Sequence, residues 1–350
     1  MKSDVYFIKT TGNDIENRKS SLLKLIKTIE PILAYKNNDI VPIKLTLGDT
    51  KCINNIKPEL VKTIVYEIKK RGAKPFLFDT NVIYKGSRGN AIDHLTLAQN
   101  KGFAQSRTGA PFIIADGILG QDGKEYDMDS RYLKNIKIPS FIGTVENLIA
   151  LSHITGHVLT GYAGAIKNIG MGMVSKPTKQ TIHSSLKPHI IEKKCTACEN
   201  CINICPVRAI SLLNGKCHID KEKCIGCGEC LCVCNFDAIF INWHEDIDKF
   251  MEKLIDAVAF IISRFKNKMF LNFAFDMTKE CDCISAKNEE ILYYDIGIFA
   301  SQDILSIEKA TIDYLNKCKK SHLNNMDKIM IEYAHKKNLG NIDYNLINLS

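Results

Sequence analysis

The cysteines of this chain are concentrated in one block whose spacing is typical of iron binding. Ten of the 14 cysteines lie between Cys195 and Cys234. A Cys-x2-Cys-x2-Cys-x3-Cys run occurs twice, and each run supplies three thiolates from a tight loop, while the fourth ligand of each [4Fe–4S] cluster comes from the other run. The pattern predicts two clusters. The first would be held by Cys195, Cys198, Cys201 and Cys234, and the second by Cys224, Cys227, Cys230 and Cys205.

A pair of zinc sites is the alternative, because Cys-x2-Cys pairs also bind zinc. Zinc does not require third and fourth cysteines at these offsets, so the spacing favours iron–sulfur clusters. Cys217 and Cys232 fall outside the repeated pattern, and we expect them to be thiols that do not bind iron.

Reactive side chains also gather in and just after a glycine-rich segment, residues 153–173. They are His153, His157, Lys167, Asn168 and His183. Glycines let the backbone approach a ligand closely, and ligands of α/β folds bind beyond strand ends such as the one preceding this segment. We therefore predict a small-molecule site with His153, His157 and Lys167 as catalytic residues. Surface or capping histidines and a solvated lysine are the alternative.

Two further features are less specific. Cys281 and Cys283 form a Cys-x-Cys pair between two predicted strands. In an extended chain they point to opposite sides, so they are either a metal or redox contact near the clusters or two unrelated thiols. Residues 79–81 and 116–117 also lie at the ends of predicted strands, but each alone is more typical of a turn than of a site.

Strands alternate with helices along the chain, which predicts an α/β fold with a mostly parallel sheet. Strands are predicted over 39–47, 75–79, 112–116, 145–152, 238–243, 269–275 and 293–299. Helices are predicted over 58–71, 90–100, 246–265 and 303–318, the last capped by Ser301, whereas 153–173 is expected to be mostly loop.

The alternation stops before the cysteine block and resumes after it, so the block is predicted to be an insertion. Residues 1–188 would form the first part of the α/β domain, 189–245 a small two-cluster module, and 246–350 the return to the α/β domain.

The composition of the chain limits the classes of partner that the protein is expected to bind. The chain has 350 residues, of which 45% are hydrophobic and 25% charged, and a net charge of +8. Arginines and aromatics are not interleaved as in base-stacking proteins, so we expect no nucleic-acid partner. The sequence has neither a membrane-length apolar run nor a signal peptide, so we expect a cytoplasmic location and no membrane partner. In that compartment dense cysteines bind metal rather than form disulfides. The oligomeric state is not predicted.

Several segments resemble the uncharacterised iron–sulfur centre proteins of domain-of-unknown-function family 362. They are residues 79–95, 109–120, 151–173, the cysteine block, 280–283 and 295–303. The resemblance covers nearly the whole chain. It implies iron–sulfur binding in an α/β domain interrupted by a bacterial-type, ferredoxin-like two-cluster module, and it implies no particular reaction.

A fainter similarity is to the nickel-pincer lactate racemases, whose motif is H-x3-G-x2-G-G-x-K with a later histidine. Here His157, Gly161, Gly164 and Lys167 fit, whereas Ala165 departs from the motif. The similarity implies that His157 acts as an acid or base, that Lys167 anchors a cofactor or substrate, and that His183 binds a metal.

These observations favour an iron–sulfur protein that relays electrons to a substrate or cofactor site on the α/β domain, that is, a ferredoxin-coupled oxidoreductase of unknown substrate. A non-enzymatic electron carrier that docks a redox partner is one alternative. A metal- or cluster-handling assembly protein, with Cys281 and Cys283 as transfer ligands, is another. An additional metal or small cofactor is left open.

Overall fold

A computed structural model gives the structure of most of the chain. It describes residues 2–10, 14–83, 86–157, 160–183, 187–205, 207–224, 230, 234, 236, 238–241, 247–279, 281–282, 291–318 and 326–349. Within these ranges, no helix is both long enough and apolar enough to cross a membrane.

An eight-stranded sheet forms the centre of the protein, with the strand order β16-β1-β15-β14-β7-β2-β3-β4. Its strands are β1 (Ser3–Lys9), β2 (Ile40–Lys44), β3 (Lys74–Asp79), β4 (Phe112–Ile114), β7 (Asn147–His153), β14 (Asn267–Thr278), β15 (Ile291–Ser301) and β16 (Tyr344–Leu349). Neighbouring strands are parallel except where β15 pairs with β1 and with β14. The predicted α/β class with a mostly parallel sheet is confirmed.

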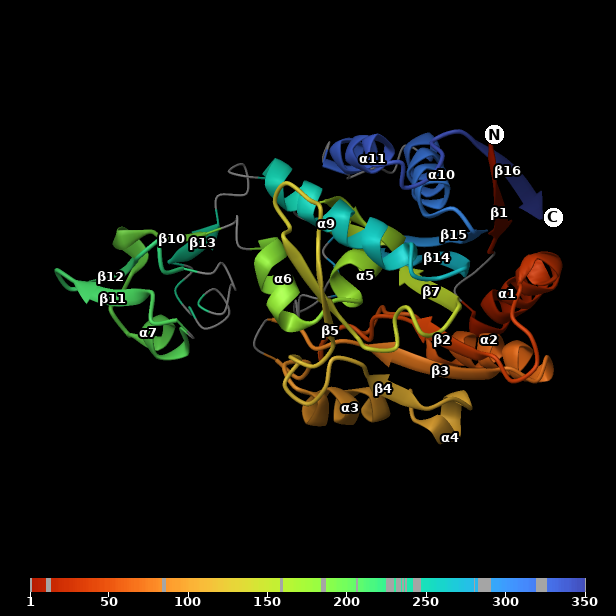
Figure 1. The fold of residues 1–350 in the computed structure, drawn as a ribbon, viewed down its shortest axis with the longest axis horizontal. Helices are drawn as coiled ribbons and strands as arrows, with labels where there is room; N and C mark the ends of the chain where they lie inside the picture. The colour runs from red at the N-terminus through yellow and green to blue at the C-terminus, as the bar shows by residue number, and fades with distance from the viewer. Residues whose placement is uncertain are drawn as a thin grey trace.

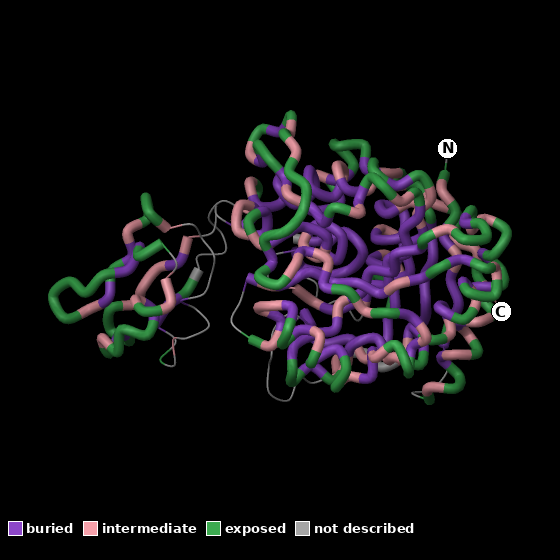
Figure 2. Tube along the Cα trace, turned by 60° about the horizontal axis from the view of Figure 1, so that its bottom comes forward, coloured by how far each residue is buried: buried purple, intermediate pink, exposed green. Residues whose placement is uncertain are grey.

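Helices cover both faces of this sheet (Figure 1). The helices are α1 (Ile15–Ile29), α2 (Pro58–Lys70), α3 (Ala91–Asn100), α4 (Gln105–Thr108), α5 (Ala165–Gly172), α6 (Lys176–His183), α9 (Ile247–Ile262), α10 (Ile304–Lys317) and α11 (Met326–Lys336), with a short 3-10 turn η1 (Glu30–Ile32). Alternate residues of a strand point to opposite faces. Accordingly Leu148 and Ala150 of β7 join the core cluster that contains α5, α9 and α10, whereas Ile149 and Leu151 join the cluster that contains α1 and α2. Figure 2 shows the buried residues concentrated in this layered part.

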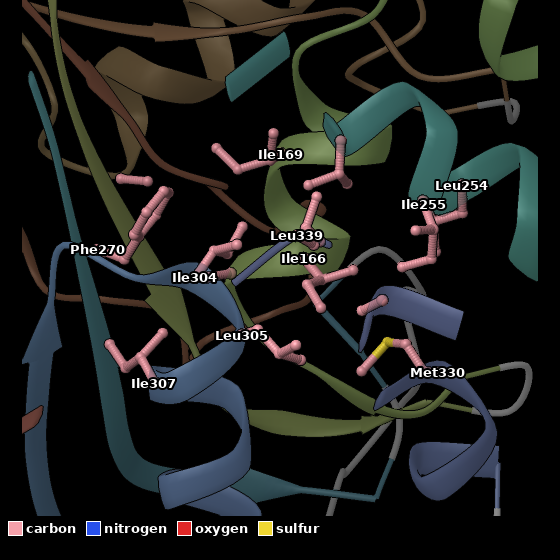
Figure 3. Close-up of a cluster of buried hydrophobic side chains, with 14 of the residues drawn as sticks. Ile166, Ile169, Leu254, Ile255, Phe270, Ile304, Leu305, Ile307, Met330 and Leu339 are labelled. Atoms are coloured by element: carbon pink, nitrogen blue, oxygen red, sulfur yellow. The ribbon is translucent and has the colours of Figure 1, made fainter. Parts of the chain in front are cut away.

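The glycine-rich segment after β7 is regular structure rather than the predicted loop. It forms a hairpin of β8 (Thr155–His157) and β9 (Gly161–Ala163), followed by α5. Its glycines allow close packing: a Cβ on Gly170 would lie 2.5 Å from Leu254 Cδ1 of α9. Ile166 and Ile169 of α5 lie in one buried cluster with residues of α9 and α10, among them Leu254 and Ile304 (Figure 3). The opposite face of α5 is thereby turned toward the sheet edge.

The helix after β15 is capped by Asp303 and not by Ser301. The Asp303 carboxylate accepts hydrogen bonds of 2.9 Å from the backbone N–H groups of Leu305 and Ser306. Ser301 ends β15, and its hydroxyl donates to the Asp4 carbonyl oxygen in β1. Both side chains are typical helix caps, so their types alone did not distinguish them.

The cysteine block lies between two short strands that pair with each other. Its described elements are β10 (Pro188–Ile190), η2 (Glu192–Lys194), α7 (Asn200–Ile204), β11 (Ile210–Leu213), β12 (Lys216–Ile219) and β13 (Ile239–Ile241). β10 pairs antiparallel with β13, and Figure 1 places these elements to one side of the large sheet. Strands from both before and after the block share the central sheet. The domain boundaries at 189 and 245 stay a prediction.

A smaller pair of strands packs beside α6. β5 (Lys124–Asp127) and β6 (Asn135–Ile138) form an antiparallel hairpin. The Lys137 backbone of β6 is held to α6 through the Thr178 hydroxyl, which accepts the Lys137 N–H at 2.7 Å. This contact fixes the start of α6, the helix that carries Lys179 and His183.

Candidate functional site

A pocket lies where the parallel strands end. β14, β7, β2 and β3 are neighbours that run in the same direction, so their carboxyl ends meet at one edge of the sheet. After β2 the chain adds β3 and β4 on one side, and later β7 and β14 on the other. The point between β2 and β7 is therefore a topological switch point, which is where ligands of open α/β sheets bind.

The pocket has a cavity volume of about 80 Å³. Residues that follow β2, β3, β7 and β14 line it together with one face of α5 and the end of α6. Those from the strand ends are Thr46, Asp79, Thr80, Ser152, His153, Cys281 and Asp282, and those from the helices are Lys167, Asn168, Met171, Gly172, Lys179 and His183. Of the predicted residues, His153, Lys167, Asn168, His183 and Cys281 thus line one pocket.

A buried ion pair forms the floor of this site. Lys44 Nζ lies 3.0 Å from Asp79 Oδ1, and neither side chain is more than 4% exposed. His94 Nε2 lies 3.6 Å from Asp79 Oδ2. Burial opposes ionisation of Asp79, but the positive charge of Lys44 and the contact with His94 outweigh it and lower the pKa of Asp79. Asp79 is therefore a carboxylate at neutral pH.

Asn168 is held rigidly between β2 and β7. Its Oδ1 accepts hydrogen bonds from Lys44 Nζ at 2.9 Å and from the Thr46 hydroxyl at 3.2 Å. Its Nδ2 donates to the Leu151 carbonyl at 2.9 Å and to the Ser152 hydroxyl at 3.1 Å. Asn168 therefore fastens α5 across the switch point, and this fixes the position of the adjacent Lys167.

His153 forms an ion pair with Asp282. Its Nδ1 lies 3.0 Å from Asp282 Oδ1, and its Nε2 lies 2.7 Å from the Phe275 carbonyl oxygen. Burial opposes the charge of His153, but Asp282, the Phe275 carbonyl group and Asp276 together outweigh burial and raise the pKa of the imidazole. Because both ring nitrogens face acceptors, the ring donates from both. This geometry favours a structural role for His153, in which the imidazolium holds the segment after β14 in place. It disfavours a role in which the ring accepts a proton.

The other ionisable groups of the pocket are perturbed by burial and by one another. Burial lowers the pKa of Lys179 to about 8. Burial and the nearby Lys167, Lys179 and Lys253 lower the pKa of His183 to about 3, so this imidazole is neutral. Lys179 Nζ donates to the Thr80 hydroxyl at 2.6 Å and to the Asn81 carbonyl oxygen.

His157, predicted to be catalytic, is not among the residues that line the pocket. Its Nδ1 accepts the Thr160 backbone N–H at 3.1 Å. Burial, followed by the charge of Lys167, holds the pKa of His157 well below its usual range. His157 is therefore a neutral imidazole close enough to the pocket cations to be affected by them, and the expectation that it shares the cavity with Lys167 is not met.

A buried carboxyl group stands behind the pocket wall at Gly164. Glu308 of α10 accepts the backbone N–H groups of Ala165 and Ile166 at the start of α5. A Cβ on Gly164 would lie 2.6 Å from Glu308 Oε1, so only glycine fits between this carboxyl group and the pocket. Burial raises the pKa of Glu308 to about 8.

Three charged residues of the pocket were missed or undervalued in the sequence. Asp79 ends a strand and was interpreted as part of a turn, whereas Arg88 and Lys179 carried no signal in their local sequence. Arg88 is 1% exposed and Lys179 is 4% exposed. A charged side chain is rarely so buried without a functional or structural partner, but the sequence does not reveal which lysines and arginines are buried.

The described cysteines of the block gather around one small hydrophobic cluster. Cys195, Cys201, Cys217 and Cys230 are buried in it, and Cys205, Cys224 and Cys234 pack against it, whereas Cys198 is exposed. Cys227 and Cys283 lie outside the described residues. Among the residues that the structure describes, no three His, Cys, Asp or Glu side chains form a metal-binding group.

Backbone N–H groups point at three of the predicted iron ligands. Cys205 Sγ accepts from Ala209 at 3.2 Å and Cys234 Sγ accepts from Ala238 at 3.4 Å, the same four-residue spacing in each half. Cys195 Sγ accepts the Cys217 N–H at 3.5 Å, and this hydrogen bond lowers the pKa of the Cys195 thiol. Hydrogen bonds to sulfur stabilise thiolates, the form that binds iron. In this respect the donor set fits an iron–sulfur site.

The fold and the pocket define an α/β protein with a cavity at the switch point of its sheet. A model of the family described as "Domain of unknown function (DUF362)" matches residues 41–313, so the chain belongs to this family. No curated protein matches the chain.

Two solved structures are similar over most of this chain. One is a protein from Thermotoga maritima, with 10% identity, a TM-score of 0.43, and coverage of 96% of this chain and 60% of that one. The other is the lactate racemase apoprotein from Thermoanaerobacterium thermosaccharolyticum, with 11% identity, a TM-score of 0.41, and coverage of 90% and 57%. The chain thus spans less than two thirds of either structure, and the similarity to the lactate racemase is faint.

Proposed function

We propose that this protein is an iron–sulfur oxidoreductase that binds two [4Fe–4S] clusters in the inserted module and a small molecule in the pocket at the switch point. The single observation that carries the proposal is the pocket itself. Lys167, His183 and His153, all predicted from the sequence as site residues, line this pocket at the sheet edge where α/β proteins bind ligands.

The support for the clusters comes from the repeated cysteine spacing and from the donors around it. The eight predicted ligands occur as two runs with the same cysteine spacing, and three of their sulfurs accept backbone N–H groups. Cys195, Cys198, Cys201 and Cys234 would hold one cluster, and Cys224, Cys227, Cys230 and Cys205 the other. When bound, the clusters would supply electron transfer.

The route of the chain supports a link between module and pocket. The block begins just after His183, which lines the pocket, and the chain returns at α9. The His183 ring packs against Phe250 of α9, with ring centroids 5.3 Å apart. Lys253 Nζ donates to the Thr181 carbonyl at 2.9 Å, which ties the same two segments together. The described helices on either side of the cysteine block, α6 and α9, therefore contact each other beside the pocket wall.

Within the pocket, the proposed roles follow the protonation states. Lys167 contacts the substrate, and the neutral His183 offers one donor and one acceptor nitrogen. His153 and Asn168 are positioning residues, because each is already held by several hydrogen bonds. His157 does not line the pocket, and its proposed role is limited to its electrostatic interaction with Lys167.

We expect anaerobically purified protein to contain about eight iron and eight sulfide per chain, as two [4Fe–4S] clusters require. Because the fourth ligand crosses between the runs, Cys205→Ala should impair the cluster of the second run while leaving that of the first. Iron and sulfide analysis with electron paramagnetic resonance of the reduced protein measures this.

Cys318→Ala is the matched control, because Cys318 is exposed at the end of α10 and outside both runs. Two bound zinc ions in place of iron would refute the cluster assignment. Loss of only the first run's cluster in Cys205→Ala would refute the crossed ligation.

A further inference from the structure

Two strand pairs of the cysteine block correspond to each other. Ile210 of β11 pairs with Ile219 of β12, and Ile239 of β13 pairs with Ile190 of β10, both antiparallel. Each of these isoleucines lies five residues from the nearer end of a cysteine run. The pair of β11 and β12 can therefore be compared with the pair of β13 and β10, position by position.

One corresponding position holds a different kind of residue in each pair. Cys217 stands two residues before Ile219, and Pro188 stands two residues before Ile190. The Cys217 backbone N–H donates to Cys195 Sγ at 3.5 Å. Proline has no backbone N–H, so Pro188 cannot donate a hydrogen bond of this kind. The contact from Cys217 is thus a particular feature of the first half and not a necessity of the fold.

The Cys217 side chain adds to this contact. It forms hydrogen bonds with Cys195 and Cys201, and all three residues are buried. Both partners are predicted ligands of the first cluster. A ligand sulfur is a thiolate, which has no proton to donate, so the Cys217 thiol is the donor. A backbone and a side-chain donor of one residue therefore point at ligands of the same predicted cluster.

A second contact fixes the position of Cys195 against β12. Lys216 Nζ donates to the Cys195 carbonyl oxygen at 2.7 Å. The lysine at the corresponding position of the other half is Lys187, and its Nζ donates to the Lys221 carbonyl oxygen. Because Lys216 holds the main chain of Cys195, the donors of the neighbouring Cys217 stay directed at its sulfur.

We propose that Cys217 raises the reduction potential of the first cluster by donating hydrogen bonds to Cys195 and Cys201. This inference rests on the proposed function, since it takes the two runs as cluster ligands. Reduction adds negative charge to a cluster and its thiolates, so donors at the sulfurs stabilise the reduced state more than the oxidised state. Cys217 binds no iron itself, and it helps to decide which of the two clusters is reduced first.

The test is the midpoint potential of each cluster, measured by electron paramagnetic resonance during stepwise reduction of the full-length, anaerobically purified protein. Cys217→Pro removes both donors and copies the residue of the corresponding strand. At a fixed potential it should lower the ratio of reduced to oxidised first cluster about tenfold, as expected for loss of a hydrogen bond to a charged group. For a one-electron couple this is a downward shift of about 59 mV.

Two milder variants and a control accompany this measurement. Cys217→Ala keeps the backbone N–H and removes the thiol, so its shift should be smaller and in the same direction. Cys217→Ser keeps a side-chain donor and should stay close to the unaltered protein. Cys318→Ala removes a thiol from an exposed position at the end of α10 and should shift neither midpoint. The midpoint that shifts should belong to the cluster that Cys205→Ala retains.

Three results would overturn the inference. One is an unchanged or raised midpoint in both Cys217→Ala and Cys217→Pro at full iron content, and another is a shift confined to the second cluster. The third is loss of iron in Cys217→Ser, which would make Cys217 itself a ligand. Iron and sulfide analysis of the unaltered protein keeps the two proposals apart. Protein without clusters refutes the proposed function, whereas protein with both clusters and unshifted midpoints refutes only the role of Cys217.

Discussion

Lys44→Met should lower the free energy of unfolding by about 3 to 5 kcal/mol, the range observed when one partner of a buried ion pair is removed. Lys44 is fully buried, and its Nζ contacts Asp79 Oδ1, Asn168 Oδ1 and the Leu45 carbonyl oxygen at 2.8 to 3.0 Å. Methionine fills a similar volume but leaves the Asp79 carboxylate without this ion pair in the interior. Urea-induced unfolding followed by circular dichroism measures the loss.

Two further variants serve as controls for the Lys44→Met measurement. Lys62→Met removes the same charge from an exposed position on α2 and should change stability little. Lys44→Met combined with Asp79→Asn removes both charges and should recover part of the loss, because no unpaired carboxylate remains. If Lys44→Met costs less than about 1 kcal/mol, the pair contributes no more than a surface ion pair does.

Glu308→Gln should remove a pH dependence of stability that the unaltered protein has between about pH 4.5 and pH 8. Burial raises the pKa of Glu308 from 4.5 to about 8. Between these values the folded protein keeps a proton that the unfolded chain has released, so stability falls as the pH rises through this window. A shift of this size corresponds to at most about 5 kcal/mol. Above pH 8 both states have released the proton, and the decline ends.

Glutamine keeps the shape and one acceptor oxygen of Glu308, so it can still accept the N–H groups at the start of α5. The readout is the difference in unfolding free energy between Glu308→Gln and the unaltered protein, measured from pH 5 to pH 9. This difference cancels the titration of all other groups and should grow in favour of the variant as the pH rises. Glu332→Gln, at an exposed position on α11, is the control. A pH-independent difference would contradict the raised pKa.

The sequence predicted those helices and strands whose local residue pattern is characteristic. The helix 58–71 begins with proline and has apolar residues at helical spacing, and it is found as α2 (Pro58–Lys70). The run at 145–152 is apolar because it is buried on both faces, and it is found as β7. The segment 153–173 was expected to be mostly loop because of its glycines, but here Gly170 allows α5 to approach α9 closely.

The candidate site was predicted where its residues are close in sequence and missed where they are close only in space. Lys167 and His183 lie near one another along the chain, so a local concentration of reactive types revealed them. Asp79 and Arg88 join them because β3, β2 and β7 are neighbours in the sheet. Lys179 lies on α6, close to His183 in the sequence, and was missed because the sequence does not reveal which lysines are buried. Strand order depends on long-range packing, which the spacing of residues along one chain does not encode.

The pairing of β7 with β14 has a consequence for how the protein is made on the ribosome. β14 is synthesised after the entire cysteine block, and β15, the partner of β1, follows β14. Until then β7 presents an unpaired edge of apolar residues, and such edges promote aggregation. The strand pairs that complete the sheet therefore join residues that are far apart in the sequence, and such contacts slow folding. We expect the nascent chain to need protection during this interval, and any iron that enters the cysteine block can do so before the sheet beside it has closed.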